Sequence, residues 1–497
     1  MKTNWKKLIT VGGSIALSAF YSSLASGQGY EVERISIPQG SDPQIGGVAY
    51  MRDGRIAACF HEGDVRIYDP SSKAWSVFAK GLQIPLGIVE EPSGAFVVAQ
   101  RSELTRLIDL DGDGQADRYD NLCDDFGVSG NYHEFSFGPA VSPEGDYFIA
   151  LNVASGLGTV SDEVRGEFLD IGYPREGFYG DWRSARDQIG RMYSRVPYRG
   201  WVLKIDAETG EMTPWASGFR SPDGIGFDAE GNLYISDNQG DWRGTSPLYH
   251  VEKGGFYGHP ASLPWTEGYA QGDPLTIPVE ALDEQRTRAA VLFTQGSMAN
   301  SPTQMIPIPE GFGPFTGQMV IGEMNRGRIL RLMLEEVNGV RQGACTPLID
   351  GGGLDAGVHR LAFGAPGELW TGHIHLSWAG GEGLARIRYT GELAKPEVQD
   401  IKIRPKGFRL QLTHPVAASL LEEGALTLSR YRFAYQRAYG SPLIDERSPE
   451  IALTQVAPDI LEVNVEEPLL RGYCYEFNLG ADFNSTLCYT VQEVPQK

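Results

Sequence analysis

One phrase recurs six times along the chain: an apolar strand, a tight acidic or glycine turn, and a second apolar strand. The copies are GGVAYMRDGRIAACF from Gly46, LGIVEEPSGAFVVAQ from Leu86, HEFSFGPAVSPEGDYFIALN from His133, DGIGFDAEGNLYISDN from Asp223, IPIPEGFGPFTGQMVIGEMN from Ile306 and GVHRLAFGAPGELWTGHI from Gly357. The acid-glycine pairs in these turns suit hairpins that need positive φ. A further apolar strand often follows a copy, as in VRIYD or RILRLML, so each unit holds about four strands.

Units of about four strands at this spacing predict an all-β chain whose residues 30–395 form a six-bladed β-propeller. The alternative, two packed sandwiches, would not require the same phrase six times. After Lys395 the chain changes to simple alternating strands with polar turns, such as VQDIKIRPKGFRLQLTHPV. This change predicts a small β-sandwich of the immunoglobulin-like type over residues 396–497. Residues 155–200 and 261–300 lack strand rhythm, and we expect them to be loops that cover one propeller face or decorate it.

The first 25 residues are typical of a secretory signal peptide, with lysines at 2, 6 and 7, an apolar run from Leu8 to Phe20, and the small residues Ser23 and Ala25. The apolar run is too short for a membrane anchor. No later segment approaches about 18 consecutive apolar residues, so we expect a protein with no membrane span that is exported to the periplasm or the medium. The formal net charge of −21 argues against nucleic acid and anionic membranes as partners.

The five cysteines are too few and too scattered for a disulfide scaffold. Only Cys474 and Cys488 lie close together in the sequence, each within an alternating apolar run. Both occupy the strand face opposite to apolar neighbours such as Tyr475 and Tyr489. A bridge between two paired strands and a pair of free thiols are both open at this point.

Propeller topology nominates the residues of a site. In each blade the loop that enters the innermost strand and the loop that leaves the second strand lie on the same face, around the central channel. The residues that these loops place on the substrate face are His61, Gln100, Arg101, Asn152, Glu323, His359, His373 and Trp378. The loops of the fourth to sixth copies also present Arg220, Asn238, Gln239, Gly240, Asp241, Trp242, Arg326 and Arg360. Six of the eight histidines lie in blade loops, which favours a polar pocket for a ligand, a metal or both, with an imidazole as general base.

The segment DLDGDGQADRYD matches the spacing of a calcium-binding loop. The ligand positions are Asp109, Asp111, Asp113, Asp117 and, in twelfth place, Asp120, with a glycine in sixth place. The twelfth residue is Asp rather than the usual bidentate Glu, and no flanking helices are evident. We expect a structural calcium ion on the outward part of a blade, with a plain acidic turn as the alternative.

The stretch GFRSPDGIGFDAEGNLYISDNQGDW, followed by LYHVEKGGFYGHP, resembles a blade of the soluble glucose and sorbosone dehydrogenases. Those are secreted six-bladed propellers that oxidise sugars with pyrroloquinoline quinone (PQQ) and calcium. As a whole the chain resembles exported bacterial sorbosone-dehydrogenase-like proteins, which share HEFSFGP, GQMVIGE, GVHRLAFG and the C-terminal KGFRLQLTHPV…YGSP domain. The resemblance spans nearly the whole chain after the signal segment.

The resemblance implies that His133 is the base that takes the substrate hydroxyl proton and that Arg220 contacts the cofactor. It also implies that the carbonyls of Gly240 and Asp241 hold a catalytic calcium ion. Two departures weaken that calcium site: Ser221 stands where the family has asparagine, and the family's acidic pair is replaced around residues 245–247. The spacing from His133 to Gly138 is also shorter than in the enzymes.

Three functions follow as hypotheses. The first is a PQQ-dependent sugar dehydrogenase that passes electrons to an external acceptor, since there is no c-type haem signature. In it Arg220, Arg326 and Arg360 contact the cofactor's carboxylates, and Trp242 or Trp378 offers a stacking surface.

The second hypothesis is a metal-dependent sugar lyase or lactonase on the same face. Its ligands would be His61, His133 and His373 together with carboxylates such as Glu323. The third is a propeller that binds a glycan without catalysis.

Overall fold

The computed structural model describes residues 25–27, 29–172, 175–176, 191–376, 380–393, 395–480, 483 and 486–496. The predicted signal peptide up to residue 24, Trp378, and most of 173–190 within the first predicted cover loop lie outside the described residues. The described chain is almost entirely β-structure, which confirms the all-β prediction. None of the helices in these ranges is long and apolar enough to cross a membrane.

The repeated phrase forms the two innermost strands of each of six antiparallel sheets in the described chain. The first three blades consist of β3 (Ile45–Tyr50), β4 (Ile56–Phe60), β5 (Val65–Asp69) and β6 (Ala74–Ala79); β7 (Ile88–Glu90), β8 (Phe96–Gln100), β9 (Glu103–Ile108) and β10 (Arg118–Cys123); and β11 (Ser136–Val141), β12 (Tyr147–Leu151), β15 (Trp201–Ile205) and β16 (Met212–Ser217). A short ladder of β13 (Ala154–Ser155) and β14 (Met192–Tyr193) accompanies the third blade.

The remaining blades complete the propeller. They consist of β17 (Gly224–Phe227), β18 (Leu233–Ser236), β19 (Ser246–His250) and β20 (Val291–Phe293); β21 (Pro302–Pro307), β22 (Met319–Glu323), β23 (Arg328–Val337) and β24 (Val340–Asp350); and β25 (Val358–Phe363), β26 (Glu368–His373) and β27 (Gly383–Tyr389) with the N-terminal β2 (Tyr30–Ile35) and β1 (Ala25–Gly27). The sixth blade therefore takes its outer strands from the start of the chain and joins the two ends of the propeller.

Close approach of the innermost strands explains the glycines in the repeated phrase. Each innermost strand packs against the next one, and β25 packs against β3, so the ring is closed. A Cβ on Gly87 would lie 1.7 Å from the carbonyl oxygen of Gly138, and one on Gly224 would lie 1.9 Å from that of Thr303. Only glycine fits at these crossings between blades.

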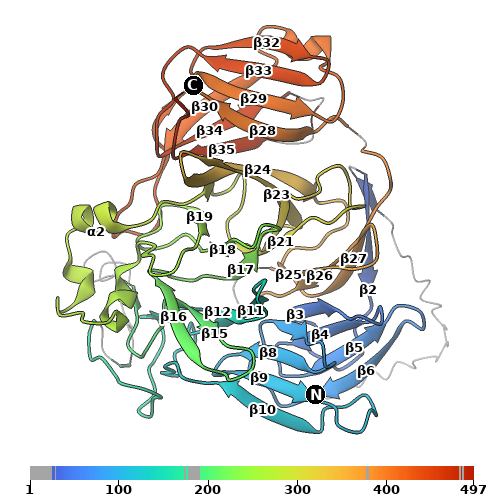
Figure 1. Cartoon of the computed structure of the whole chain (residues 1–497), viewed down its shortest axis with the longest axis vertical. Helices are drawn as coiled ribbons and strands as arrows, with labels where there is room; N and C mark the ends of the chain where they lie inside the picture. The colour runs from blue at the N-terminus through green and yellow to red at the C-terminus, as the bar shows by residue number, and fades with distance from the viewer. Residues whose placement is uncertain are drawn as a thin grey trace, which may run out of the picture.

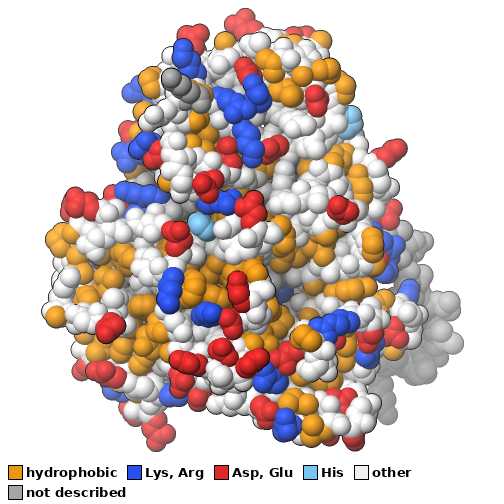
Figure 2. Space-filling view, viewed as in Figure 1, with side chains coloured by type: hydrophobic (Ala, Val, Ile, Leu, Met, Phe, Trp, Pro, Cys, Tyr) orange, Lys and Arg blue, Asp and Glu red, His pale blue; other side chains and the backbone are white. Residues whose placement is uncertain are grey.

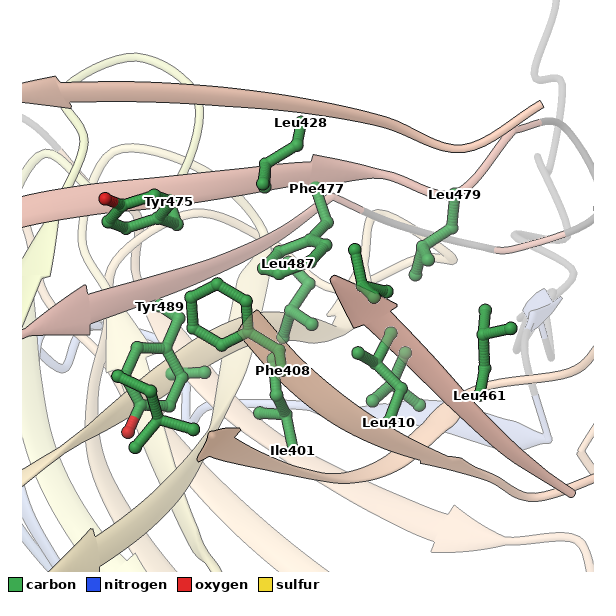
Figure 3. Close-up of a cluster of buried hydrophobic side chains, with 14 of the residues drawn as sticks. Ile401, Phe408, Leu410, Leu428, Leu461, Tyr475, Phe477, Leu479, Leu487 and Tyr489 are labelled. Atoms are coloured by element: carbon green, nitrogen blue, oxygen red, sulfur yellow. The ribbon is translucent and has the colours of Figure 1, made fainter. Parts of the chain in front are cut away.

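The C-terminal residues form a two-sheet sandwich (Figure 1). One sheet has the order β28 (Val398–Arg404), β29 (Gly407–Leu412), β33 (Ile460–Val465) and β32 (Ile451–Ala457), and the other β35 (Leu487–Val491), β34 (Tyr473–Asn478), β30 (Thr427–Arg432) and β31 (Ile444–Arg447). The inward side chains of both sheets make the core shown in Figure 3. Phe408 lies at its centre, with ring centroids 5.1 Å from Phe477, 5.2 Å from Tyr489 and 5.5 Å from Tyr475.

The sandwich continues the fifth blade instead of following it as a separate unit. Strand β24 pairs with β35, so β21 to β24 and four sandwich strands form one eight-stranded sheet. The buried guanidinium of Arg331 in β23 also donates to the carbonyl oxygens of Val398 and Gln399, where the sandwich begins. These bonds fix the sandwich relative to the propeller.

Cys474 and Cys488 lie on the face of the sheet that points away from the sandwich core, as the alternation of apolar residues in their strands predicted. Cys474 and Cys488 are buried beside Tyr431 and Cys345, whereas Tyr475 and Tyr489 point into the sandwich. In the structure all five cysteines are free thiols.

Short helical segments lie outside the strands. They are η1 (Pro260–Trp265), η2 (Pro274–Thr276) and α2 (Val279–Gln285) beside the fourth blade, and η3 (Ala418–Leu421) in the sandwich.

Candidate functional site

A cavity of about 580 Å³ opens among the loops that topology nominated. Blade loops supply most of its lining, and the sandwich supplies one residue, Tyr439. The lining residues are His61, Ile84, Arg101, Tyr132, His133, Phe135, Phe137, Asn152, Arg191, Arg220, Ser221, Asp223, Asn238, Gln239, Gln295, Asn300, Ser301, Asn325, Leu376 and Tyr439. The structure thus brings together His61, Arg101, His133, Asn152, Arg220, Asn238 and Gln239 among the predicted site residues.

His133 is positioned as a neutral base by the loop that precedes β11. Its Nδ1 lies 2.7 Å from the carbonyl oxygen of Val153, and because a carbonyl only accepts, Nδ1 carries the proton. Nε2 therefore keeps its lone pair. Burial, and then the positive charge of Arg220, lower the pKa of His133 to about 3. The imidazole is consequently unprotonated at neutral pH, with the lone pair of Nε2 free.

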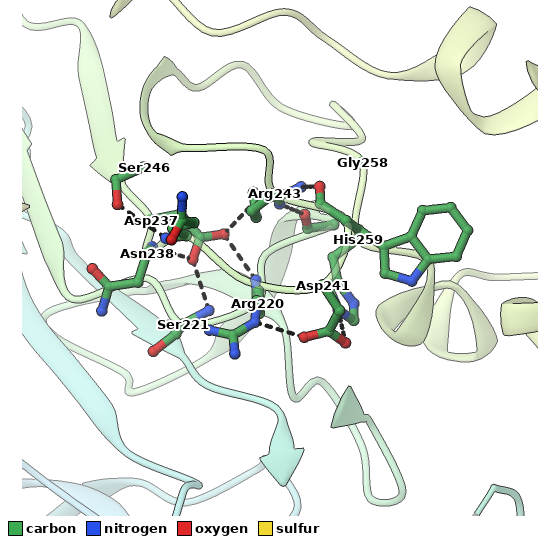
Figure 4. A network of polar contacts seen from close by, with 12 residues as sticks. Arg220, Ser221, Asp237, Asn238, Asp241, Arg243, Ser246, Gly258 and His259 are labelled. Atoms are coloured by element: carbon green, nitrogen blue, oxygen red, sulfur yellow. Dashed lines mark hydrogen bonds and ion pairs between the residues drawn. The ribbon is translucent and has the colours of Figure 1, made fainter. Parts of the chain in front are cut away.

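The loop SDNQGDWRG, which follows β18, is held by the carboxylate of Asp237 (Figure 4). Asp237 accepts hydrogen bonds from the backbone amides of Arg220 at 2.9 Å and Ser221 at 2.7 Å, and from Nε of Arg243 at 3.1 Å. It is fully buried. This single carboxylate therefore ties the loop that enters β17 to the loop that leaves β18.

A second carboxylate, that of Asp241, is also fully engaged inside the protein. One oxygen accepts from Nε of Arg220 at 2.9 Å, and the other lies 3.4 Å from Nε2 of His259. Although burial alone would raise the pKa of Asp241, hydrogen bonds and charges of His259 and Arg220 hold it well below its usual range. Asp241 thus positions Arg220 at the cavity wall, and no reacting role falls to its carboxylate.

The cavity is electropositive, although the chain as a whole is acidic. Acidic side chains are spread over both the propeller and the sandwich in Figure 2. In the cavity lining, by contrast, Arg101, Arg191 and Arg220 outnumber the single acidic residue Asp223, and Arg220 is also paired with Asp241 behind the wall. The carboxylate of Asp223 already lies 2.9 Å from His359 Nε2 and 3.2 Å from Arg360 Nη1. An anionic ligand would therefore be favoured here.

Three asparagines add acceptors that the fold leaves open. Within the described residues, Oδ1 of Asn152, Asn238 and Asn325 is buried and accepts no hydrogen bond. Buried acceptors without partners are costly, so they are typical of places where a ligand supplies the donor. Hydroxyl groups of a sugar have this chemistry.

Several predicted site residues stabilise the propeller instead of lining the cavity. The guanidinium of Arg360 donates to Leu86 O, Asp223 and His359 O, so its donors are occupied. His359 is paired with Asp223, and His373 is buried between the hydroxyl of Thr371 and the carbonyl oxygen of Ala356, each 2.9 Å away.

The other predicted residues outside the cavity also have local partners. Gln100 accepts from the amide of Gln83 at 2.6 Å and donates to Thr105. Glu323 accepts from the backbone amides of Asn300, Ser301 and Arg326. Arg326 is exposed, and Trp242 is buried against Tyr435, with ring centroids 5.6 Å apart. None of these residues lines the cavity.

At the position that the family resemblance implies for a catalytic calcium ion, several oxygen atoms already have protein partners. The carbonyl oxygen of Gly240 already accepts the amide of Gly440 at 2.9 Å, and both carboxylate oxygens of Asp241 are paired. The carboxylate of Asp237 is likewise taken by four donors. In the described residues no three His, Cys, Asp or Glu side chains converge in the cavity to bind a metal, so the ligand set of the lyase hypothesis is not assembled.

The acidic loop after β9 does bring together candidate calcium ligands. Oxygen atoms of Asp109, Asp111 and Asp117 lie within 4.8 Å of one another. Asp113 is not part of this group, and Asp120 lies in β10, where it pairs with Arg118 at 3.1 Å. Three of the five predicted ligands are therefore placed for one cation, on the outer edge of the second blade.

Sequence reasoning missed the aromatic wall of the cavity, formed by Tyr132, Phe135, Phe137 and Tyr439, and the cation Arg191. The first three flank His133 in the third phrase, so their alternation around that histidine could have found them. Tyr439 begins the YGSP segment of the sandwich, far from any blade in the sequence.

The chain matches no protein-family model and no curated protein sequence. Solved structures with a similar fold include the PQQ-bound aldose sugar dehydrogenase of Streptomyces coelicolor, 12% identical, with a TM-score of 0.45 over 72% of this chain and 98% of that one. The holo PQQ domain of Coprinopsis cinerea pyranose dehydrogenase is 12% identical, with a TM-score of 0.46 over 73% and 96%. A calcium structure of a Trichoderma reesei carbohydrate-active enzyme of family AA12 is 12% identical, with a TM-score of 0.48 over 75% and 98%. These values are too low to assign an activity. What the structure itself defines is a six-bladed β-propeller joined to a β-sandwich, with a cationic, aromatic cavity at its centre.

Proposed function

We propose that this protein is an exported sugar dehydrogenase that uses PQQ, with its site in the cavity beside His133. The observation that carries the proposal is the presence of a neutral histidine base, with Nε2 unprotonated, in the same cavity as three arginines. A base of this kind can remove a proton from a substrate hydroxyl.

The lining of the cavity fits the cofactor. PQQ is a flat ring system with three carboxylates, and Arg101, Arg191 and Arg220 supply positive charge for such groups. Phe135, Phe137 and Tyr439 supply aromatic surface for a flat ring. When bound, the quinone supplies the acceptor for a hydride.

The chain's own residues would do the rest of the work. Oδ1 atoms of Asn152, Asn238 and Asn325 accept hydroxyl hydrogens of the sugar and orient it. His133 takes the hydroxyl proton on Nε2, while the carbonyl of Val153 holds the ring in place through Nδ1. Electrons then leave to an external acceptor, because the chain has no haem signature.

The metal-dependent lyase or lactonase is less well supported. His373, one of its three histidines, is buried between Thr371 and Ala356, outside the cavity. Glu323 is bound to backbone amides. A glycan-binding propeller without catalysis would use the same aromatic wall, but nothing in that role needs a neutral imidazole among arginines.

Reconstitution tests the proposal. The purified mature chain is mixed with PQQ, freed of excess by gel filtration, and its absorbance is recorded before dye reduction is followed with a panel of aldoses. We expect stoichiometric quinone absorbance and sugar-dependent dye reduction. Cofactor binding without reduction by any sugar would favour a binding protein, and absence of binding would reject the quinone.

A further inference from the structure

The fixed position of the sandwich gives one of its loops direct access to the cavity. Strand β35 is paired with β24 of the fifth blade, and Arg331 holds the start of the sandwich through Val398 and Gln399. The loop between β30 and β31, residues 433–443, extends from this anchored sheet to the fourth blade. We call it the docking loop.

Backbone hydrogen bonds hold the docking loop against the loop SDNQGDWRG of the fourth blade. The amide of Gly440 donates to Gly240 O at 2.9 Å, and the amide of Trp242 donates to Gln436 O at 3.0 Å. Trp242 has φ 61°, a left-handed conformation that is unusual for a residue other than glycine, and the bond to Gln436 holds it there. The two loops therefore form one surface.

Side chains strengthen this junction. The hydroxyl of Tyr435 donates to Gly258 O at 2.5 Å, and the guanidinium of Arg437 donates to Leu275 O at 2.7 Å. A Cβ on Gly244 would lie 2.5 Å from Ala434 O, which shows how closely the backbones approach. The docking loop thus reaches the cavity from a defined direction.

Tyr439 is the residue that this junction presents to the cavity. Its ring lies 5.5 Å from the guanidinium carbon of Arg220 and 5.7 Å from that of Arg191. It is 40% exposed and lines the same cavity as His133. An exposed aromatic face between two cavity arginines is a surface on which a flat anionic ring can stack.

We propose that Tyr439 of the sandwich is a ligand contact of the propeller cavity and that its ring stacks against the bound cofactor. The proposal rests on the proposed function for the identity of the ligand as PQQ. The sandwich is then part of the site, because it adds one aromatic side chain to the three that the blades supply. Arg191 and Arg220 would supply positive charge for the cofactor's carboxylates, and the ring of Tyr439 would supply aromatic surface.

The experiment measures equilibrium binding of PQQ to the full-length mature chain by quenching of tryptophan fluorescence. We expect Tyr439→Ala to weaken binding roughly tenfold, because the stacking face is lost, and Tyr439→Phe to stay within about twofold of wild type. Leu443→Ala is the control, an equally exposed residue of the same loop that lies outside the cavity. Far-ultraviolet circular dichroism and thermal unfolding show whether each variant is folded.

A second probe separates failure of this inference from failure of the proposed function. Calorimetric titration with D-glucose and D-glucuronate is run on the same variants. If wild type binds PQQ and Tyr439→Ala binds it equally well, the role of Tyr439 is rejected and the quinone proposal stands. If wild type binds a sugar but not PQQ, the quinone is rejected, and the effect of Tyr439→Ala on that sugar decides the role of the tyrosine. A wild-type chain that binds none of the three ligands contradicts both proposals.

Discussion

The backbone amide of Gly440 donates a hydrogen bond to the carbonyl oxygen of Gly240, 2.9 Å away. This contact joins the sandwich to the loop SDNQGDWRG, and it occupies an oxygen that the family resemblance assigned to calcium. Arg220, Asp241 and His259 complete the arrangement, since the carboxylate joins the guanidinium to the imidazole. These protein groups therefore stabilise the loop.

The first prediction concerns Asp241. Asp241→Asn removes the negative charge from between Arg220 and His259, both of which are buried. Breaking a buried pair by removing one partner typically lowers the free energy of unfolding by about 3 kcal/mol. Urea denaturation measures this loss. Asp53→Asn, which breaks an exposed pair with Arg55, should change it by less than about 0.5 kcal/mol. Equal stability of the two variants would show that Asp241 does not hold the loop.

The second prediction separates two places for calcium. Calcium at about one hundred times its Kd should raise the free energy of unfolding by about 2.7 kcal/mol through the group of Asp109, Asp111 and Asp117. The double variant Asp109→Asn and Asp117→Asn should lose this response, measured as a shift in Tm. Chelation should leave the affinity for PQQ unchanged, because the carbonyl oxygen of Gly240 already accepts the amide of Gly440. Weaker PQQ binding after chelation would support a calcium ion at the cofactor site.

The third prediction concerns the charge of His133. Its pKa is lowered to about 3 by burial and by Arg220, so its imidazole should not titrate between pH 5 and 8. NMR of ¹³C-labelled histidine, assigned by the loss of one signal in His133→Gln, measures this directly. A midpoint near the ordinary value of 6.5 would show that burial and the positive charge of Arg220 do not lower the pKa of His133.

The lowered pKa of His133 also makes the stability of the fold depend on pH. Because the unfolded chain binds a proton at His133 below pH 6.5 and the folded chain does so only near pH 3, stability falls as the pH drops through this window. His359, whose pKa is lowered to about 4 by burial and by Arg360, adds to the loss. His133→Gln should make the fall shallower by up to one proton's contribution, about 1.4 kcal/mol per pH unit.

The fourth prediction concerns the thiols. All five cysteines are buried and free, so none should react with a maleimide in the native protein. After denaturation without reductant, mass spectrometry should show five adducts. Three adducts would reveal a bridge in the isolated protein, and peptide mapping would then decide whether Cys474 and Cys488 form it.

The repeats predicted the propeller well because each phrase contains its own hairpin. The phrase from Asp223, for example, spans β17, its turn and β18, and local turn chemistry sets both strands. The union of sandwich and fifth blade was not predictable in this way. Strand β24 pairs with β35, with Cys345 opposite Cys488, and these strands are far apart in the sequence. Pairing between two edge strands leaves no periodic signal in the sequence.

Placement in the cavity was predictable where a residue follows a strand end, and it was not predictable where a hydrogen-bond partner sets the direction of the side chain. His133 and Arg220 line the cavity as topology indicated. Arg360 comes from an equally suitable place, but Asp223 and the carbonyl of Leu86 draw its guanidinium into the protein interior. Tyr439 was missed because only the packing of the sandwich against the propeller brings it to the cavity.

The measurement that tests the account most directly is the reduction of bound PQQ by a sugar in a single turnover, with wild type and His133→Gln compared after loading to the same occupancy. We predict that both bind the quinone, and that wild type bleaches its absorbance on addition of sugar at least a hundredfold faster, an effect typical of general-base catalysis. Equal rates in the two proteins would show that His133 is not the base. A wild-type chain whose bound quinone no sugar reduces would contradict the proposed function itself.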